Sequence, residues 1–250
     1  MTRIASHRGG TLEFGDSTPS GFAATADMPL EEVEFDLHPT ADGAIIVHHD
    51  ATLDRTTDRV GAIAEFSGSE VRKAVISYSR NEHPLLLEEL CATFAASRVQ
   101  FRCEIKPDAE GRPYRHFVPR VIEVLRRHDR LEQTHFSSFL IEILDEIGAV
   151  SDRPRLWLVS PPVLNQLGRK AVVELARNHS IPEIGVHIDQ ADAALMAAVK
   201  DAGLDFGCWA AHSARQIEKA LDLAVKVFTT DRPSLAIAIR DRYRSAENAS

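Results

Sequence analysis

The chain has 250 residues, a formal net charge of −8 and an apolar content of 44%. This length suits one large core of the size typical of a (β/α)₈ barrel, although two half-sized domains would also fit. The sequence pI near 5.8 argues against nucleic acid or an anionic membrane surface as the main partner. An anionic substrate is not excluded, because a metal ion and a few basic side chains supply positive charge locally.

Eight segments with the residue pattern of strands each precede a helix-like segment. The strands are expected at 3–6, 32–38, 98–106, 133–137, 155–159, 184–188, 205–210 and 226–230. The helices are expected at 22–26, 85–97, 116–128, 139–147, 164–178, 191–202, 214–223 and from 233 to about 240. Eight such units predict an α/β fold, a closed (β/α)₈ TIM barrel, as one domain over residues 1–250.

Three stretches fall outside this alternation. Pro19-Ser20-Gly21 predicts irregular structure before the first helix. Residues 58–84, rich in Gly and Ser, predict a short surface insertion after the second strand, with one helix near 69–75. Residues 241–250 are expected to form a fraying tail.

The cysteines and the termini indicate the compartment. Cys91, Cys103 and Cys208 form neither a zinc-binding nor a C-x-x-C pattern, and are predicted to be buried free thiols in a reducing environment. The N-terminus is too polar for a signal peptide, and no apolar stretch has the length of a membrane span. We therefore expect a cytoplasmic protein without stable membrane insertion, and the sequence leaves a homo-oligomer open.

Carboxylates gather at the predicted ends of two neighbouring strands. Glu34 and Asp36 lie two residues apart, so they project from the same face of one strand, and Glu104 closes the next barrel strand. Like charges so close suggest a cation between them. Three oxygen ligands suit a hard divalent ion, Mg²⁺ or Ca²⁺.

Basic residues and histidines are expected at the same rim, because barrel active sites lie at the C-terminal ends of the strands. His7 and Arg8 end the first strand, Lys106 ends the third, and His49 follows the Asp42-Gly43 turn and a short strand from Ile45. Arg8 and Lys106 suit phosphate oxygens. His7 and His49 are candidate general acid and base, in an order that the sequence leaves open. Metal, cations and histidines together indicate phosphodiester cleavage.

Each piece alone has a plainer explanation. His7-Arg8-Gly9 is commonly an exposed turn, Glu34-x-Asp36 a solvated strand edge, and Glu104-Ile105-Lys106 a salt-bridged strand end. His48 and His49 together could be surface residues, and one of the two is expected to be. Trp209 and Phe139 both lie near strand ends and are candidates for lining a substrate pocket. The alternative is that they pack under loops, which is the more common role of such aromatic residues.

Taken together, these motifs resemble the glycerophosphodiester phosphodiesterase family, a group of barrels similar to phosphatidylinositol-specific phospholipases C. The motifs that carry the resemblance are His7-Arg8-Gly9, Glu34-x-Asp36, Asp42-Gly43, His49-Asp50-x-x-Leu53-x-Arg55-Thr56-Thr57, Glu104-Ile105-Lys106, Trp209-Ala210-Ala211-His212 and Thr230-Asp231-Arg232-Pro233. The resemblance implies metal-dependent hydrolysis of glycerophosphodiesters to glycerol 3-phosphate and an alcohol. It implies that His7 and His49 are catalytic, that Glu34, Asp36 and Glu104 bind the metal, and that Arg8 and Lys106 contact the phosphate.

Two departures from the family pattern leave roles open. Gly15-Asp16-Ser17-Thr18 stands where many members have Pro-Glu-Asn-Thr, and His212 stands where they commonly have Asn. The short insertion predicts a more open mouth than in members with a capping domain. A lysophospholipase D or other phospholipase-type phosphodiesterase, and a non-catalytic barrel that binds phosphorylated ligands, remain alternatives; the histidine pair argues against the last.

Overall fold

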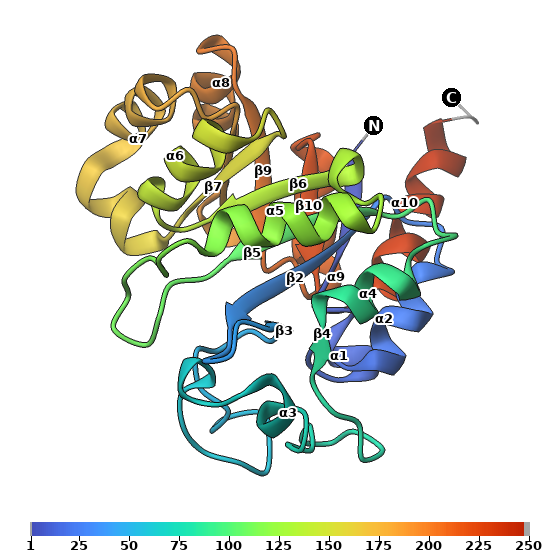
Figure 1. Ribbon diagram of the computed structural model, residues 1–250. Coiled ribbons are helices and arrows are strands. Elements are labelled where there is room, and N and C mark those ends of the chain that lie inside the picture. The colour runs from blue at the N-terminus through green and yellow to red at the C-terminus, as the bar shows by residue number, and fades with distance from the viewer. Residues whose placement is uncertain (1, 248–250) are drawn as a thin grey trace.

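The computed structural model describes residues 2–247, and its main element is a closed barrel of eight parallel strands (Figure 1). The barrel strands are β1 (Arg3–His7), β2 (Glu32–Pro39), β5 (Gln100–Ile105), β6 (Thr134–Ser138), β7 (Arg155–Val159), β8 (Glu183–His187), β9 (Asp205–Trp209) and β10 (Val227–Thr230). The barrel closes because β1 pairs in parallel with both β2 and β10. The predicted TIM barrel and its eight strands are confirmed.

Helices surround the barrel, as expected for an alternating β–α sequence. They are α1 (Thr11–Phe14), α2 (Pro19–Ala26), α4 (Leu87–Thr93), α5 (Phe117–Arg127), α6 (Ile141–Val150), α7 (Pro161–Asn178), α8 (Ala193–Asp201), α9 (Ala214–Asp222) and α10 (Pro233–Glu247), with 3₁₀ turns η1 (Ile63–Glu65), η2 (Leu131–Gln133) and η3 (Ile188–Gln190). No helix among residues 2–247 is long and apolar enough to cross a membrane.

Several predicted boundaries are wrong. The segment expected to be irregular contains helix α1 and the first turn of helix α2. Helix α2 starts at Pro19, because the side chain of its N-cap residue Thr18 accepts a hydrogen bond from the amide of Gly21. The helix expected from 85 begins at Leu87, because Leu85 and Leu86 form strand β4 against β3. The last helix runs to Glu247 rather than fraying from 241, and residues 248–250 lie outside the described part.

Residues 40–86, which include the predicted insertion and are called the insertion below, extend the barrel sheet beyond its rim (Figure 1). Strand β3 (Ile45–Val47) pairs antiparallel with β2 and with β4 (Leu85–Leu86). A short helix α3 (Gly68–Val71) lies within the predicted insertion and begins earlier than expected, at the capping box of Ser67. The insertion has its own small apolar cluster of Ile46, Leu53, Ile63, Val71 and Ala74.

Strand alternation decides what faces the inside of the barrel. On β5, Phe101, Cys103 and Ile105 belong to the main hydrophobic core, whereas the alternate residues Arg102 and Glu104 line a cavity inside the barrel. The interior of this barrel is therefore unusually polar. The three cysteines are buried and unpaired, as predicted.

Candidate active site

The three predicted metal ligands meet at the C-terminal ends of β2 and β5. Glu34, Asp36 and Glu104 are all buried, and one carboxylate oxygen of each lies within 4.8 Å of the others. Asp36 and Glu104 are direct partners in the parallel register of the two strands. The sequence spacing of two residues places Glu34 on the same face as Asp36.

This donor set fits a divalent cation. Asp36 is 1% exposed and Glu104 is 5% exposed, so water does little to stabilise their charges and nearby positive groups must do so. Burial raises the pKa of Glu34 well above its usual range, and the charges of Asp36 and Glu104 raise it further. Burial also raises the pKa of Glu104. Crowded carboxylates in this state are stabilised by a positive ion among their oxygens.

Two basic side chains offset part of this negative charge. Lys106 Nζ lies 2.6 Å from Glu104 Oε1 and 3.0 Å from Asp36 Oδ1, and Arg8 Nε lies 3.3 Å from Asp36 Oδ2. Burial alone would raise the pKa of Asp36, but Lys106, His49 and Arg8 together lower it far below its usual range. The predicted phosphate-contacting residues thus lie directly beside the predicted metal ligands.

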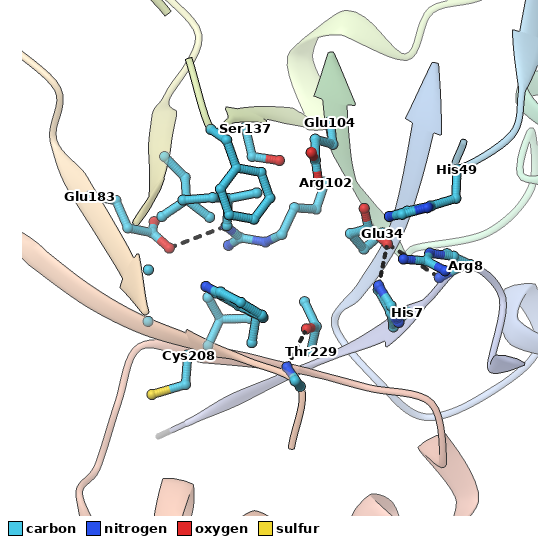
Figure 2. Close-up of a pocket in the computed structure, with 18 of the residues that line it drawn as sticks. His7, Arg8, Glu34, His49, Arg102, Glu104, Ser137, Glu183, Cys208 and Thr229 are labelled. Atoms are coloured by element: carbon cyan, nitrogen blue, oxygen red, sulfur yellow. Dashed lines mark hydrogen bonds and ion pairs between the residues drawn. The ribbon is translucent and has the colours of Figure 1, made fainter. Parts of the chain in front are cut away.

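His7 points from the end of β1 at the same cluster (Figure 2). Its Nε2 lies 3.8 Å from Glu34 Oε2, and its Nδ1 donates to Asp231 Oδ1 at 2.5 Å. A carboxylate accepts only, so this bond places the proton on Nδ1 and leaves Nε2 as the free lone pair. Burial lowers the pKa of His7, the nearby Arg8 lowers it further, and Asp231 opposes both.

His49 reaches the cluster from the loop after β3 (Figure 2). Its Nδ1 contacts Asp50 Oδ1 at 2.5 Å, and Asp50 in turn accepts from Arg55 Nε at 2.6 Å. Its backbone carbonyl accepts from Nε2 of the buried His38 at 3.1 Å. Burial lowers the pKa of His38 to about 4, so this imidazole stays neutral and anchors the loop. His48 is buried and its Nε2 contacts the Thr56 hydroxyl, so it is not the surface residue expected of this histidine pair.

Sequence reasoning assigned no role to three residues that contact the site. Asp231 holds His7 although the two lie 224 residues apart, and its backbone amide donates to Nδ1 of His212 at 3.0 Å. Asp16 accepts from Arg8 at 3.1 Å and contacts Arg55 at 3.4 Å, so it ties the first loop to the insertion. The motif Thr230-Asp231-Arg232-Pro233 was the available signal for Asp231.

A cavity of about 260 Å³ opens beside these groups. His7, Arg8, His49 and Lys106 line it, together with residues from β6 to β10. Phe139 and Trp209 also line it and contact each other edge to face at 5.7 Å. Both aromatic residues that the sequence suggested for a pocket therefore border this cavity.

Comparisons with known proteins identify the family of this chain. The sequence model of the glycerophosphoryl diester phosphodiesterase family matches residues 7–235. A glycerophosphodiester phosphodiesterase from Bacillus altitudinis is 24% identical over 253 residues, covering 98% of this chain and 100% of that protein.

Solved structures share the fold over nearly the whole chain. A protein from Agrobacterium tumefaciens str. C58, provisionally named a glycerophosphoryl diester phosphodiesterase, is 66% identical with a TM-score of 0.97, over 98% of this chain and 99% of that one. An Oleispira antarctica phosphodiesterase, solved with the product sn-glycerol-3-phosphate, has a TM-score of 0.83 at 19% identity, over 96% and 97% of the two chains. The second likeness concerns the fold alone.

Proposed function

The chain belongs to the glycerophosphoryl diester phosphodiesterase family and is a phosphoric diester hydrolase, and on this premise we propose how it works. It cleaves a glycerophosphodiester to glycerol 3-phosphate and an alcohol, with His7 and His49 as general acid and base beside a divalent cation. The product complex of the Oleispira antarctica relative supports this choice of product.

The observation that carries the proposal is the placement of the two imidazoles. Each uses Nδ1 to contact a carboxylate, His7 with Asp231 and His49 with Asp50. Each therefore has Nε2 available on the cavity side, next to the acid cluster. One such nitrogen removes the proton of the nucleophile, which is either water or the neighbouring glycerol hydroxyl, and the other protonates the departing alcohol oxygen. If the glycerol hydroxyl attacks, a water molecule then opens the cyclic phosphate to give glycerol 3-phosphate. Either histidine fits either role.

The remaining charged groups position the phosphate. Arg8 and Lys106 border both the cavity and the acids, so their charges hold the phosphodiester between the histidines, a positioning effect. Glu34, Asp36 and Glu104 would hold the Mg²⁺ or Ca²⁺, which supplies positive charge to a phosphate oxygen in the transition state. The three unpaired, buried cysteines support the proposal of a cytoplasmic location.

The direct test measures hydrolysis of a panel of glycerophosphodiesters by the purified chain. We expect glycerol 3-phosphate release that a chelator abolishes and that Mg²⁺ or Ca²⁺, added back separately, restores. A lysophospholipid in the same panel tests the lysophospholipase D alternative. Activity that survives thorough chelation would remove the metal from the mechanism.

The histidine roles are tested by substitution. His7→Ala and His49→Ala should each lower kcat by roughly 10²–10⁴-fold without changing the melting temperature appreciably. His128→Ala, at the exposed end of α5, is the matched control and should leave kcat unchanged. Full activity in both active-site variants would exclude acid–base catalysis by these residues.

A further inference from the structure

The loop between β9 and α9 places His212 beside Asp231, the residue that holds His7. The backbone amide of Asp231 donates to Nδ1 of His212 at 3.0 Å, and Oδ1 of Asp231 accepts from Nδ1 of His7 at 2.5 Å. The rings of His212 and His7 lie 5.8 Å apart, and both residues line the cavity. One chain of hydrogen bonds therefore runs from His212 through Asp231 to His7.

This hydrogen-bond pattern fixes the protonation state of His212. A backbone amide only donates, so Nδ1 of His212 is the acceptor and carries no proton. The same Nδ1 lies 3.5 Å from Oδ2 of Asp231, but without a proton it cannot donate there. Burial lowers the pKa of His212 below its usual range although the charge of Asp231 opposes the shift. His212 is therefore a neutral imidazole that serves Asp231 as an acceptor.

Both backbone polar groups of Asp231 are held in this way. Its amide donates to His212, and its carbonyl accepts from the amide of Leu12 in α1 at 3.1 Å. Asp231 directly follows the last residue of β10, so the strand ladder does not fix it. Loss of the acceptor on His212 would leave the amide of Asp231 without this partner and the residue free to shift.

The loop that carries His212 is itself tied to β10. The amides of Ala210 and Ala211 donate to Thr229, the first to its hydroxyl at 3.4 Å and the second to its carbonyl at 3.0 Å. Ala210 has a left-handed φ of 64°, which is unfavourable for alanine. Strained backbone of this kind persists where surrounding contacts require it, and it is concentrated at functional sites. The loop conformation thus holds His212 next to Asp231.

We propose that His212 is a positioning residue for catalysis. Its Nδ1 holds the backbone of Asp231, so that the Asp231 carboxylate keeps the proton of His7 on Nδ1 and leaves Nε2 of His7 as the reactive nitrogen. His212 acts through Asp231 and not on the substrate. This inference deepens the proposed function and rests on it.

Three substitutions separate the acceptor from the rest of the side chain. His212→Leu keeps similar bulk without an acceptor, and His212→Gln moves the acceptor one bond farther out. His212→Asn keeps an acceptor oxygen as many bonds from the backbone as Nδ1, but removes Nε2. We expect His212→Leu and His212→Gln to lower kcat roughly 3- to 30-fold with little change in KM, and His212→Asn to restore most of that loss.

Proton NMR provides a readout that needs no turnover. The Nδ1 protons of His7 and His49 each lie in a short hydrogen bond to a carboxylate, and such protons resonate far downfield of ordinary amide protons. Loss of one signal in His7→Ala and of the other in His49→Ala assigns them. In His212→Leu the His7 signal should shift or broaden, whereas the His49 signal should stay in place as an internal reference.

His179→Leu is the matched control. This imidazole is also half-buried and its Nδ1 also contacts an aspartate, Asp145, at 2.8 Å, but it lies at the end of α7 and does not line the cavity. It should leave kcat and both NMR signals unchanged. Thermal unfolding identifies any variant that loses the fold, and if His212→Leu does so, the comparison of His212→Gln with His212→Asn decides.

Two results would overturn the proposal. One is a kcat and a His7 signal that His212→Leu and His212→Gln leave as in wild type. The other is a His212→Asn variant as impaired as His212→Leu, because the acceptor at Nδ1 would then not be the group that matters. If the wild type hydrolyses no diester, the proposed function is contradicted instead, and the His7 signal still decides whether His212 holds Asp231.

Discussion

Two groups of charged side chains lie in the same barrel, one at the rim and an inner one near the N-terminal ends of the strands. The rim cluster consists of Glu34, Asp36, Glu104, Arg8 and Lys106, and the inner cluster of Glu32, Glu183, Arg3, Arg102 and Lys226. Strands β2 and β5 contribute to both, with Glu32 two residues before Glu34 and Arg102 two residues before Glu104.

The two clusters differ in their charge balance. In the inner cluster three acids face three bases once Asp205, the second partner of Lys226, is counted. Burial would raise the pKa of Glu32, but Arg102, His135 and Arg3 together lower it strongly. At the rim three acids face two bases, and the pKa values of Glu34 and Glu104 rise. The charges of the inner cluster are thus balanced, whereas the rim cluster keeps an excess of negative charge. This difference supports the proposal that the rim cluster binds a metal ion and that the inner cluster is a structural ion network.

Exchanging one carboxylate for its amide in each cluster should separate activity from stability. Glu34→Gln should lower kcat roughly 10²–10³-fold, because a ligand of the charge-stabilising cation is lost. Its metal-free stability should equal or exceed that of wild type, because a repelled charge is removed. Glu32→Gln should retain most activity and lose about 3 kcal/mol of unfolding free energy, because buried Arg102 loses one of its two acid partners.

Both variants are measured by turnover with metal and by urea unfolding in chelator. The comparison fails if Glu34→Gln destabilises the metal-free chain as much as Glu32→Gln does.

Replacing Arg102, the base shared by Glu32 and Glu183, tests how much the inner cluster contributes to stability. Arg102→Met should cost about 3–5 kcal/mol, because Glu32 and Glu183 remain buried without their shared partner. Arg126→Met, which breaks an exposed ion pair with Glu123, is the control and should cost less than about 1 kcal/mol. Equal unfolding free energies for the two variants would show that the inner cluster is not structural.

The pKa of Glu34 in the rim cluster is raised, whereas that of Glu32 in the inner cluster is lowered, so the two carboxyl groups should change stability with pH in opposite directions. A carboxyl group whose folded pKa is raised favours the folded state in its protonated form, so the metal-free wild type loses stability as pH rises through that pKa. The advantage of Glu34→Gln over wild type should therefore appear at neutral pH and vanish in acid. Each unit by which the pKa of Glu34 is raised is worth about 1.4 kcal/mol. Denaturant titrations in chelator across this range measure it, and an advantage that grew in acid would contradict the sign.

The smallest effect is expected where the first loop meets the insertion. Asp16→Asn keeps the shape of the side chain but weakens its hold on Arg8 and Arg55. We expect KM to rise roughly 3- to 10-fold with little change in kcat, as for one weakened charged hydrogen bond. Steady-state kinetics test this, and a loss confined to kcat would assign Asp16 a different role.

The sequence predicted the barrel well because its signals are local. Period-two alternation in segments such as 98–106 and period-3.6 patterns in segments such as 116–128 each lie within about a dozen residues. The misplaced boundaries are also local: Pro19 looked like a break but occupies the first turn of α2, where proline is favoured. The roles of His7, His49, Glu34, Asp36 and Glu104 stay predictions, although the fold brings all five together.

By itself, then, the sequence determined which residues face inward, because neighbours two apart on a strand share a face whatever the rest of the chain does. Only the tertiary structure decided their partners across the barrel. His7 meets Asp231, and Arg102 meets Glu183, only because β1 closes onto β10 and the strands adopt one register. The cavity beside the histidines likewise exists only once the strands are side by side, since a cavity is a property of packing and not of any segment.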